Sequence, residues 1–226
     1  MSTEYTARRR GRPPRIDREQ ILAVARHMDP EVLTMRAVAG ALGVDPSALN
    51  YHVVDREGLL DLLAADRLRV VMSGLSLPSD ADWEITCRAY ADQARAGILR
   101  AGTLSFRLRL PALGGVQTFE AVETVLQRLS AAGLSTTASG RILLLLNQVV
   151  FASARDAALG VQSKDSDTGS PDLARLLDDL PTDGLALSRQ ALATWDPASD
   201  EQFQFGVDIV VDGVAQAIRR AATRGA

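Results

Sequence analysis

Apolar side chains recur at intervals of three and four residues along most of the chain, and no long stretch alternates apolar with polar positions. The first pattern is that of an α-helix with one buried face, whereas strict alternation indicates a strand. The pattern therefore predicts an all-α protein. Helices are expected over residues 18–28, 35–42, 46–53, 56–73, 83–100, 118–132, 136–159, 172–180, 183–194 and 201–223.

Capping signals place a helix-turn-helix in the first quarter of the chain. Thr34 is a good N-cap for the second helix, and Gly43 stands where that helix would end in left-handed geometry. Asp45 caps the third helix, with Pro46 at its first position, where a missing N–H costs nothing. Two short helices joined by a glycine-containing turn have the spacing of a helix-turn-helix motif.

The helix over 56–73 is amphipathic and joins this motif to a larger helical body. Loops are expected over 74–82 and over 160–171, the second exposed and mobile because it is rich in Ser, Asp and Gly. The stretch 102–116 reads as a short helix followed by a loop. We therefore expect a basic arm over residues 1–16, a helix-turn-helix domain over 17–65, and a larger helical domain over 66–226.

Composition excludes several classes of protein. The chain has 226 residues, 46% of them hydrophobic, and its most apolar run covers only 142–146, so no membrane span is expected. Residues 1–15 contain no apolar core of a secretory signal, which favours the cytoplasm. Cys87 is the only cysteine and is expected in the core, and with two histidines the chain has too few ligands for a metal site.

An enzyme is the first rival interpretation. The sequence contains neither a Gly-x-Ser-x-Gly motif nor a phosphate-binding glycine-rich loop. We therefore expect no catalytic residues and no cofactor.

The net charge of −3 hides a segregation of charge along the chain. Within eleven positions near the start, a cluster of arginines is opposed only by Asp17: Arg8, Arg9, Arg10, Arg12, Arg15 and Arg18. Acidic residues dominate the later helices. A basic arm on an acidic body indicates that the arm is the part that meets nucleic-acid phosphates.

The third helix has the chemistry of a DNA-recognition helix. Its packing side holds Leu49 and Val53, which leaves these residues to face outward: Pro46, Ser47, Ala48, Asn50, Tyr51 and His52. Asn50 can bond an adenine edge, Arg36 can bond a guanine edge, and Ala48 can touch a thymine methyl group. The full set of predicted DNA-binding residues is Arg10, Arg12, Thr34, Arg36, Asp45, Pro46, Ser47, Ala48, Asn50, Tyr51, His52 and Arg56.

Tyr51, His52 and Arg56 are expected on phosphates, where they would fix register without reading sequence. For Tyr51 and His52, a purely structural role at the end of the helix is the alternative.

Residues 33–53, LTMRAVAGALGVDPSALNYHV, resemble the DNA-binding motif of the tetracycline-repressor (TetR) family, and the likeness continues through DREGLLD at 55–61. A weaker resemblance to the final helix of the tetracycline-repressor-like subgroup covers FQFGVDIVVDGV at 203–214. The resemblance implies a three-helix DNA-binding bundle followed by a helical ligand-binding and dimerisation domain. The family often has a longer polar residue at the position of Pro46 and a bulky aromatic at that of Asn50, so the operator sequence does not transfer.

The arm sequence RRRGRPPR at 8–15 resembles the core of an AT-hook, an extended segment that lies in a narrow minor groove. The negative potential of that groove attracts arginine. The alternative is a disordered basic tail that adds only salt-sensitive affinity.

One short recognition helix covers too little of a groove for operator specificity, so a homodimer on a palindromic double-stranded operator is expected. The resemblance implies a four-helix bundle between two copies, and an ordinary monomer core is the alternative. The predicted interface residues are Leu143, Phe205, Ile209, Val210, Val214 and Ile218.

The resemblance also implies an apolar effector pocket in the body. Its candidate lining residues are Trp83, Phe106, Arg107, Arg109, Phe119, Asn147, Gln148, Phe151 and Asp156. Arg107 and Arg109 favour an anionic effector of unknown identity. The tetracycline-binding members have histidines where this chain has Arg109 and Gln148, which argues against a magnesium–tetracycline ligand.

Together these patterns predict a transcription regulator, a repressor by the commoner mode of the family, which an effector releases from its operator by shifting a conformational equilibrium. The rival is an architectural DNA-binding dimer without an effector.

Overall fold

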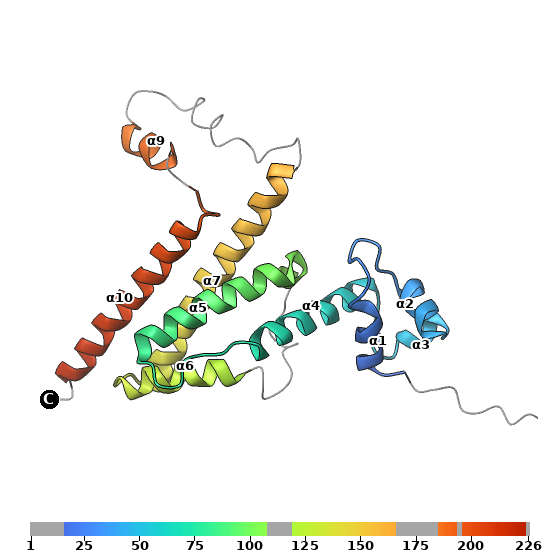
Figure 1. Cartoon of the computed structure of the whole chain (residues 1–226), viewed down its shortest axis with the longest axis horizontal. Helices are drawn as coiled ribbons and strands as arrows, with labels where there is room; N and C mark the ends of the chain where they lie inside the picture. The colour runs from blue at the N-terminus through green and yellow to red at the C-terminus, as the bar shows by residue number, and fades with distance from the viewer. Residues whose placement is uncertain (1–15, 108–118, 166–184, 194–195, 225–226) are drawn as a thin grey trace, which may run out of the picture. The chain divides into compact units, whose positions relative to one another are not determined.

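The computed structural model describes residues 16–107, 119–165, 185–193 and 196–224, and every regular element in these ranges is a helix (Figure 1). The prediction of an all-α protein is thus confirmed. In chain order the elements are α1 (Arg18–Ala25), α2 (Met35–Leu42), α3 (Pro46–Leu49), α4 (Arg56–Ser73), α5 (Trp83–Ala101), the 3₁₀ helix η1 (Thr103–Arg107), α6 (Glu120–Ala131), α7 (Thr136–Asp165), α9 (Ala186–Ala193) and α10 (Asp200–Arg224).

Some helix ends differ clearly from the sequence prediction. Helix α1 ends at Ala25 rather than at residue 28, and α3 ends at Leu49 rather than at residue 53. Helix α7 continues through Gly160 to Asp165, where a loop was expected, because a single glycine does not end a helix. The remainder of that expected loop, the expected helix over 172–180 and all but the last residue of the basic arm expected over 1–16 lie outside the described residues.

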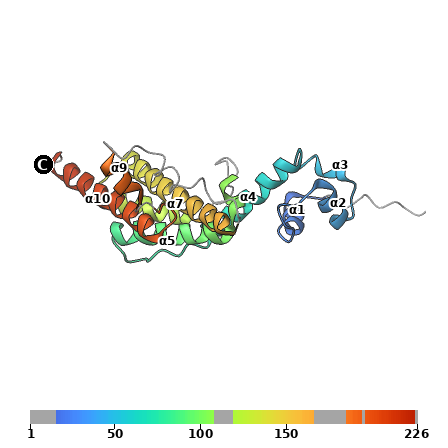
Figure 2. The ribbon, with the colours of Figure 1, turned by 90° about the horizontal axis from the view of Figure 1, so that it is seen from above.

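The chain divides into two compact units, Met1–Leu63 and Ala64–Ala226, close to the domain boundary expected at residues 65 and 66. In the first unit, α2 packs against both α1 and α3 (Figure 2). Its buried apolar side chains come from α1, α2, α3, the segments that join them and the first turns of α4: Ile21, Leu22, Ala25, Leu33, Val38, Ala39, Leu49, Val53, Leu59, Leu60 and Leu63.

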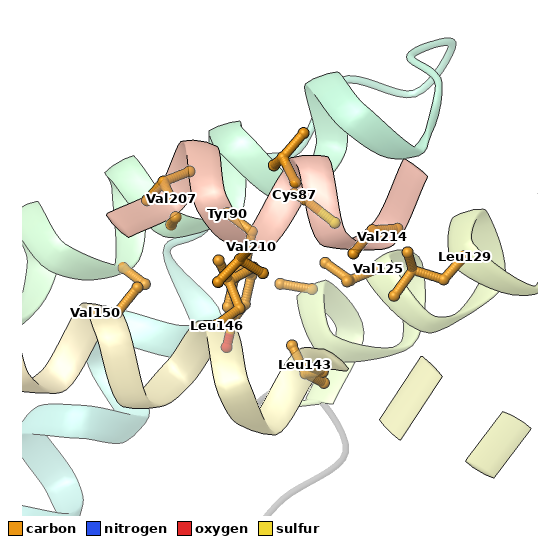
Figure 3. Close-up of a cluster of buried hydrophobic side chains, with 14 of the residues drawn as sticks. Cys87, Tyr90, Val125, Leu129, Leu143, Leu146, Val150, Val207, Val210 and Val214 are labelled. Atoms are coloured by element: carbon orange, nitrogen blue, oxygen red, sulfur yellow. The ribbon is translucent and has the colours of Figure 1, made fainter. Parts of the chain in front are cut away.

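The second unit is built around α7, which packs against α5, α6 and α10. Figure 3 shows side chains of all four helices converging on one apolar cluster. Among the residues it labels are Cys87 and Tyr90 of α5, Leu146 of α7 and Val207 of α10. Burial of this many apolar side chains is the main favourable contribution to the stability of the unit.

By length and composition alone, one helix among the described residues, α7 over Thr136–Gly160, is apolar enough to cross a membrane. The packing of α7 on three neighbouring helices accounts for part of its apolar composition, since 28% of that apolar window is buried.

Candidate DNA-binding and effector-domain sites

The start of α2 is held by the cap that the sequence predicted. Thr34 is extended, and its Oγ1 accepts a hydrogen bond from the N–H of Ala37 at 3.1 Å. At the other end Gly43 has φ +68°, the left-handed geometry that glycine adopts most readily. Arg36 lies in the first turn between these caps with an exposed side chain. The cap therefore presents Arg36 from a helix whose start is well defined.

Helix α3 begins with a compact Asp45–Ser47 cap. The Asp45 Oδ1 atom accepts from the Ser47 backbone N–H at 2.9 Å and from the Ser47 Oγ at 2.6 Å. The hydrogen bond from the Ser47 side chain, with that from its backbone, lowers the pKa of the Asp45 carboxyl. The Ser47 hydroxyl donates its only proton to Asp45, so it has only acceptor capacity left for another partner.

Beyond Leu49 the chain continues in a turn that keeps the helical sense. His52 N–H and Val53 N–H both donate to the Leu49 carbonyl oxygen, at 2.8 and 2.9 Å. Leu49 and Val53 are buried, as the packing side requires. Tyr51 is 90% exposed.

The predicted recognition residues differ in how accessible they are. Pro46, Ser47 and Asn50 are exposed like Tyr51, whereas Ala48 and His52 are half-buried. Half-burial leaves less of the Ala48 methyl group and of the His52 ring for DNA than the sequence pattern suggested.

Arg56 was predicted to contact a DNA phosphate, but its side chain binds backbone atoms of the protein. Its Nε donates to the carbonyl oxygen of Leu33 at 2.8 Å, and its Nη2 donates to that of Pro30 at 2.9 Å and to that of Glu31 at 3.3 Å. These contacts favour a structural role for Arg56 over the predicted phosphate contact.

The predicted dimer residues divide into two groups in the single chain. Leu143, Val210 and Val214 are buried in the core of their own chain, which leaves little of each side chain for a contact with a partner. Ile218 is partly buried against that core. Phe205 and Ile209 are 59% and 58% exposed. The difference follows from helical rotation, since the core covers only one side of α10.

Helix α7 also exposes two large apolar residues, both leucines, which are not among the predicted interface residues. Leu144 and Leu145 are exposed next to the buried Leu143 and Leu146. In a run of four leucines the helical period gives no clue to which side is buried. We call Leu144, Leu145, Phe205 and Ile209 the exposed apolar stripe.

The core of the second unit contains a buried polar pair between α5 and α7. The Tyr90 hydroxyl donates to Asn147 Oδ1 at 2.8 Å. Burial raises the pKa of Tyr90 to about 12, although the hydrogen bond to Asn147 acts in the opposite direction. Asn147 was a predicted pocket residue, and its amide carbonyl is engaged by this partner from the same core.

Arg95 forms a second polar cluster that the sequence analysis missed. Its Nε donates to Ser153 Oγ at 2.9 Å, its Nη1 lies 2.7 Å from Asp200 Oδ1, and its guanidinium lies over the Phe203 ring. The guanidinium is nearly fully buried and joins α5, α7 and α10. The sequence contained a signal for this burial. Arg95 lies four residues after Ala91 and three before Ile98, so helical spacing places it on the same face of α5 as these two apolar residues.

The other predicted pocket residues are not all brought together. Trp83, Phe106 and Phe151 are partly buried against the central cluster, and Asp156 is half-buried. Gln148 and Phe119 are exposed, and Gln148 lies one turn along α7 from Leu144, which argues against a pocket role for it. The Arg107 side chain and Arg109 lie outside the described residues.

Cys87 is buried, as predicted, and burial raises the pKa of its thiol to about 11. Within the described residues no group of three or more His, Cys, Asp or Glu side chains is placed to hold a metal ion.

The two units together are typical of one class of protein, the DNA-binding regulators that combine a helix-turn-helix with a separate helical domain. Residues 76–218 match the family described as Tetracyclin repressor-like, C-terminal domain. The chain belongs to this family of transcription regulators.

Individual relatives agree with this assignment. The tetracycline repressor protein class A from transposon 1721 of Escherichia coli is 29% identical over 187 residues, which cover 81% of this chain and 82% of that protein. The Streptomyces coelicolor TetR family protein ActR in complex with (S)-DNPA has a TM-score of 0.69 at 22% identity, covering 90% of this chain and 98% of ActR. TetR from Acinetobacter baumannii AYE has a TM-score of 0.56 at 23% identity, over 90% and 98% of the two chains. The two solved structures establish the similarity of fold.

Proposed function

We propose that the chain is a cytoplasmic, homodimeric repressor that binds a palindromic operator and is released from it by a small-molecule effector. The observation that carries the proposal is the doubly capped α2–turn–α3 motif, which exposes Arg36, Asn50 and Tyr51 on a unit continuous with a tetracycline-repressor-like domain. No catalytic role, cofactor or membrane partner is proposed.

Operator reading is assigned chiefly to Arg36 and Asn50. Arg36 is the exposed cation of α2 and matches the two acceptors of a guanine edge, and Asn50 matches an adenine edge. Tyr51 is exposed enough to reach a phosphate. Thr34 and Asp45 contribute through their caps, which position the two helices.

The arginine arm, in particular Arg10 and Arg12, is proposed to enter the minor groove beside the site. The support is the RRRGRPPR sequence at 8–15. Extended arginines stiffened by proline suit a narrow minor groove over A·T-rich DNA.

The homodimer is proposed to form through the exposed apolar stripe on α7 and α10. Four large apolar side chains exposed on two packed helices form the kind of surface that marks a protein interface. The half-site geometry of a helix-turn-helix requires a second copy in any case.

The second unit is proposed to bind the effector. Polar groups of Tyr90, Asn147 and Arg95 lie beside apolar side chains of the core, a combination typical of sites that recognise a small molecule. ActR has been crystallised with (S)-DNPA and with actinorhodin, and a variant of TetR from Acinetobacter baumannii AYE has been crystallised with minocycline. An architectural dimer without an effector is the second candidate.

Replacement of Arg36 tests operator reading. An operator is first selected from a random DNA pool, and Arg36→Ala is then expected to weaken binding by about 5- to 150-fold, or about 1–3 kcal/mol, with relaxed preference at one base pair. Arg100→Ala removes an exposed arginine of α5 in the second unit and serves as the matched control. An equal loss on operator and unrelated DNA would contradict base reading by Arg36.

Deletion of residues 1–14 tests the arm. The truncated chain is expected to lose affinity for operators with A·T-rich flanks, and its dependence of log affinity on log salt should become shallower because fewer phosphates are neutralised. Fluorescence anisotropy at several salt concentrations measures both effects. The minor-groove proposal fails if operators with A·T-rich and G·C-rich flanks lose affinity equally, since a disordered tail would behave in that way.

Replacement of Ile209 tests the dimer. Ile209→Glu is expected to sediment as a monomer at micromolar concentration, because a carboxylate at the centre of an apolar interface would be desolvated without a partner. Ile85→Glu makes the same change on α5, where the isoleucine is 52% exposed against 58% for Ile209, and should leave the dimer intact. If Ile209→Glu remains a dimer, the exposed apolar stripe is not the dimer interface.

Release by a small molecule separates a repressor from an architectural protein. Operator complexes are titrated with (S)-DNPA, actinorhodin and minocycline, and then with a metabolite extract. At least one is expected to weaken operator binding about tenfold or more and to raise the melting temperature of the free protein. If none does either, the architectural interpretation is favoured.

A further inference from the structure

Arg56 is the first residue of α4, and its side chain turns toward the segment between α1 and α2. Three carbonyl oxygens of that segment, those of Pro30, Glu31 and Leu33, accept hydrogen bonds from its Nε and Nη2. Backbone carbonyls outside a regular helix require donors of their own, and one arginine supplies three of them here. Arg56 thus ties two segments that lie 23 to 26 residues apart in the sequence.

The tied segment leads directly into α2, the helix that carries Arg36. Leu33 is fully buried, and the next residue, Thr34, is the N-cap of α2. Arg36 follows two residues later, in the first turn of α2. A shift of the Leu33 carbonyl therefore moves the cap and the start of the helix that carries Arg36.

The chemistry of this contact requires arginine. A guanidinium offers donors from Nε and Nη2 in one rigid plane, whereas a lysine ammonium is a single point with rotating donors. The remaining nitrogen, Nη1, lies 3.6 Å from the Glu57 carboxylate, which offsets the positive charge of Arg56. A cation that is hydrogen-bonded to carbonyls and paired with a carboxylate is a poor anchor for phosphate.

We propose that Arg56 is a positioning residue for operator reading, which holds the start of α2, and with it Arg36, in register with the first turn of α4. The inference rests on the proposed function of Arg36.

The test compares Arg56→Lys and Arg56→Gln in the full-length protein on the selected operator and on unrelated DNA, at several salt concentrations. Arg56→Lys keeps the positive charge but loses the planar set of donors on Nε and Nη2. We expect it to weaken operator binding about tenfold or more, with an unchanged salt slope and with reduced discrimination at the base pair that Arg36 reads. Arg56→Gln should behave in the same way.

Coupling to Arg36 distinguishes positioning from general stabilisation. Arg36→Ala should cost much less in the Arg56→Lys background than in the wild-type protein, because the arginine is already misplaced. Arg67→Lys is the matched control, since Arg67 also lies on α4 and donates from Nη1 to a carbonyl, that of Ala101, but within the second unit. It should leave operator discrimination unchanged.

Three outcomes would overturn the inference. The first is that Arg56→Gln lowers the salt slope by about one while Arg56→Lys restores it, which is the signature of a phosphate contact. The second is that Arg56→Lys lowers the melting temperature but, well below it, binds and discriminates like the wild type. The third is that the effects of Arg36→Ala and Arg56→Lys are additive. If the wild-type protein selects no operator at all, the proposed function itself fails, and that result is distinct from these three.

Discussion

The burial of Leu49 and Val53 is the interaction on which the DNA-binding unit depends. Helix α3 has only four residues, and a helix of that length is not stable by itself in water. Its position must therefore come from its contacts with α2 and from the Asp45–Ser47 cap at its start. A recognition helix without stability of its own is only as well placed as the helices around it, which gives the caps and the contacts of Arg56 their importance.

A comparable constraint governs the second unit, where α7 serves two purposes. One side of the helix packs on α5, α6 and α10, whereas Leu144 and Leu145 are exposed, as are Phe205 and Ile209 of α10. Large apolar residues on a second side of a helix indicate a surface that another element or a partner covers. The exposed apolar stripe and the need of the helix-turn-helix for a second copy therefore lead to the same expectation of a homodimer.

Much of the fold was predictable because its signals are local. The caps at Thr34, Gly43 and Asp45 involve neighbours within a few residues, and the structure confirms each of them. Gly160 shows the limit of such signals, since a glycine beside a polar stretch resembles a helix end although α7 continues past it. At the level of sites, Arg95 and Tyr90 were overlooked, because helical spacing shows which face a residue occupies but not whether a polar group on that face finds a partner.

By itself the sequence determined the helical class, the helix-turn-helix, and the family resemblance, because these follow from spacing and capping along a short stretch of chain. Only the tertiary structure decided which leucines of α7 are buried, because that depends on where α5, α6 and α10 pack around the helix. It also showed the partners of Arg56, whose chemistry suits a phosphate as well as a carbonyl. The carbonyls that it binds lie 23 to 26 residues away, beyond the reach of any local pattern.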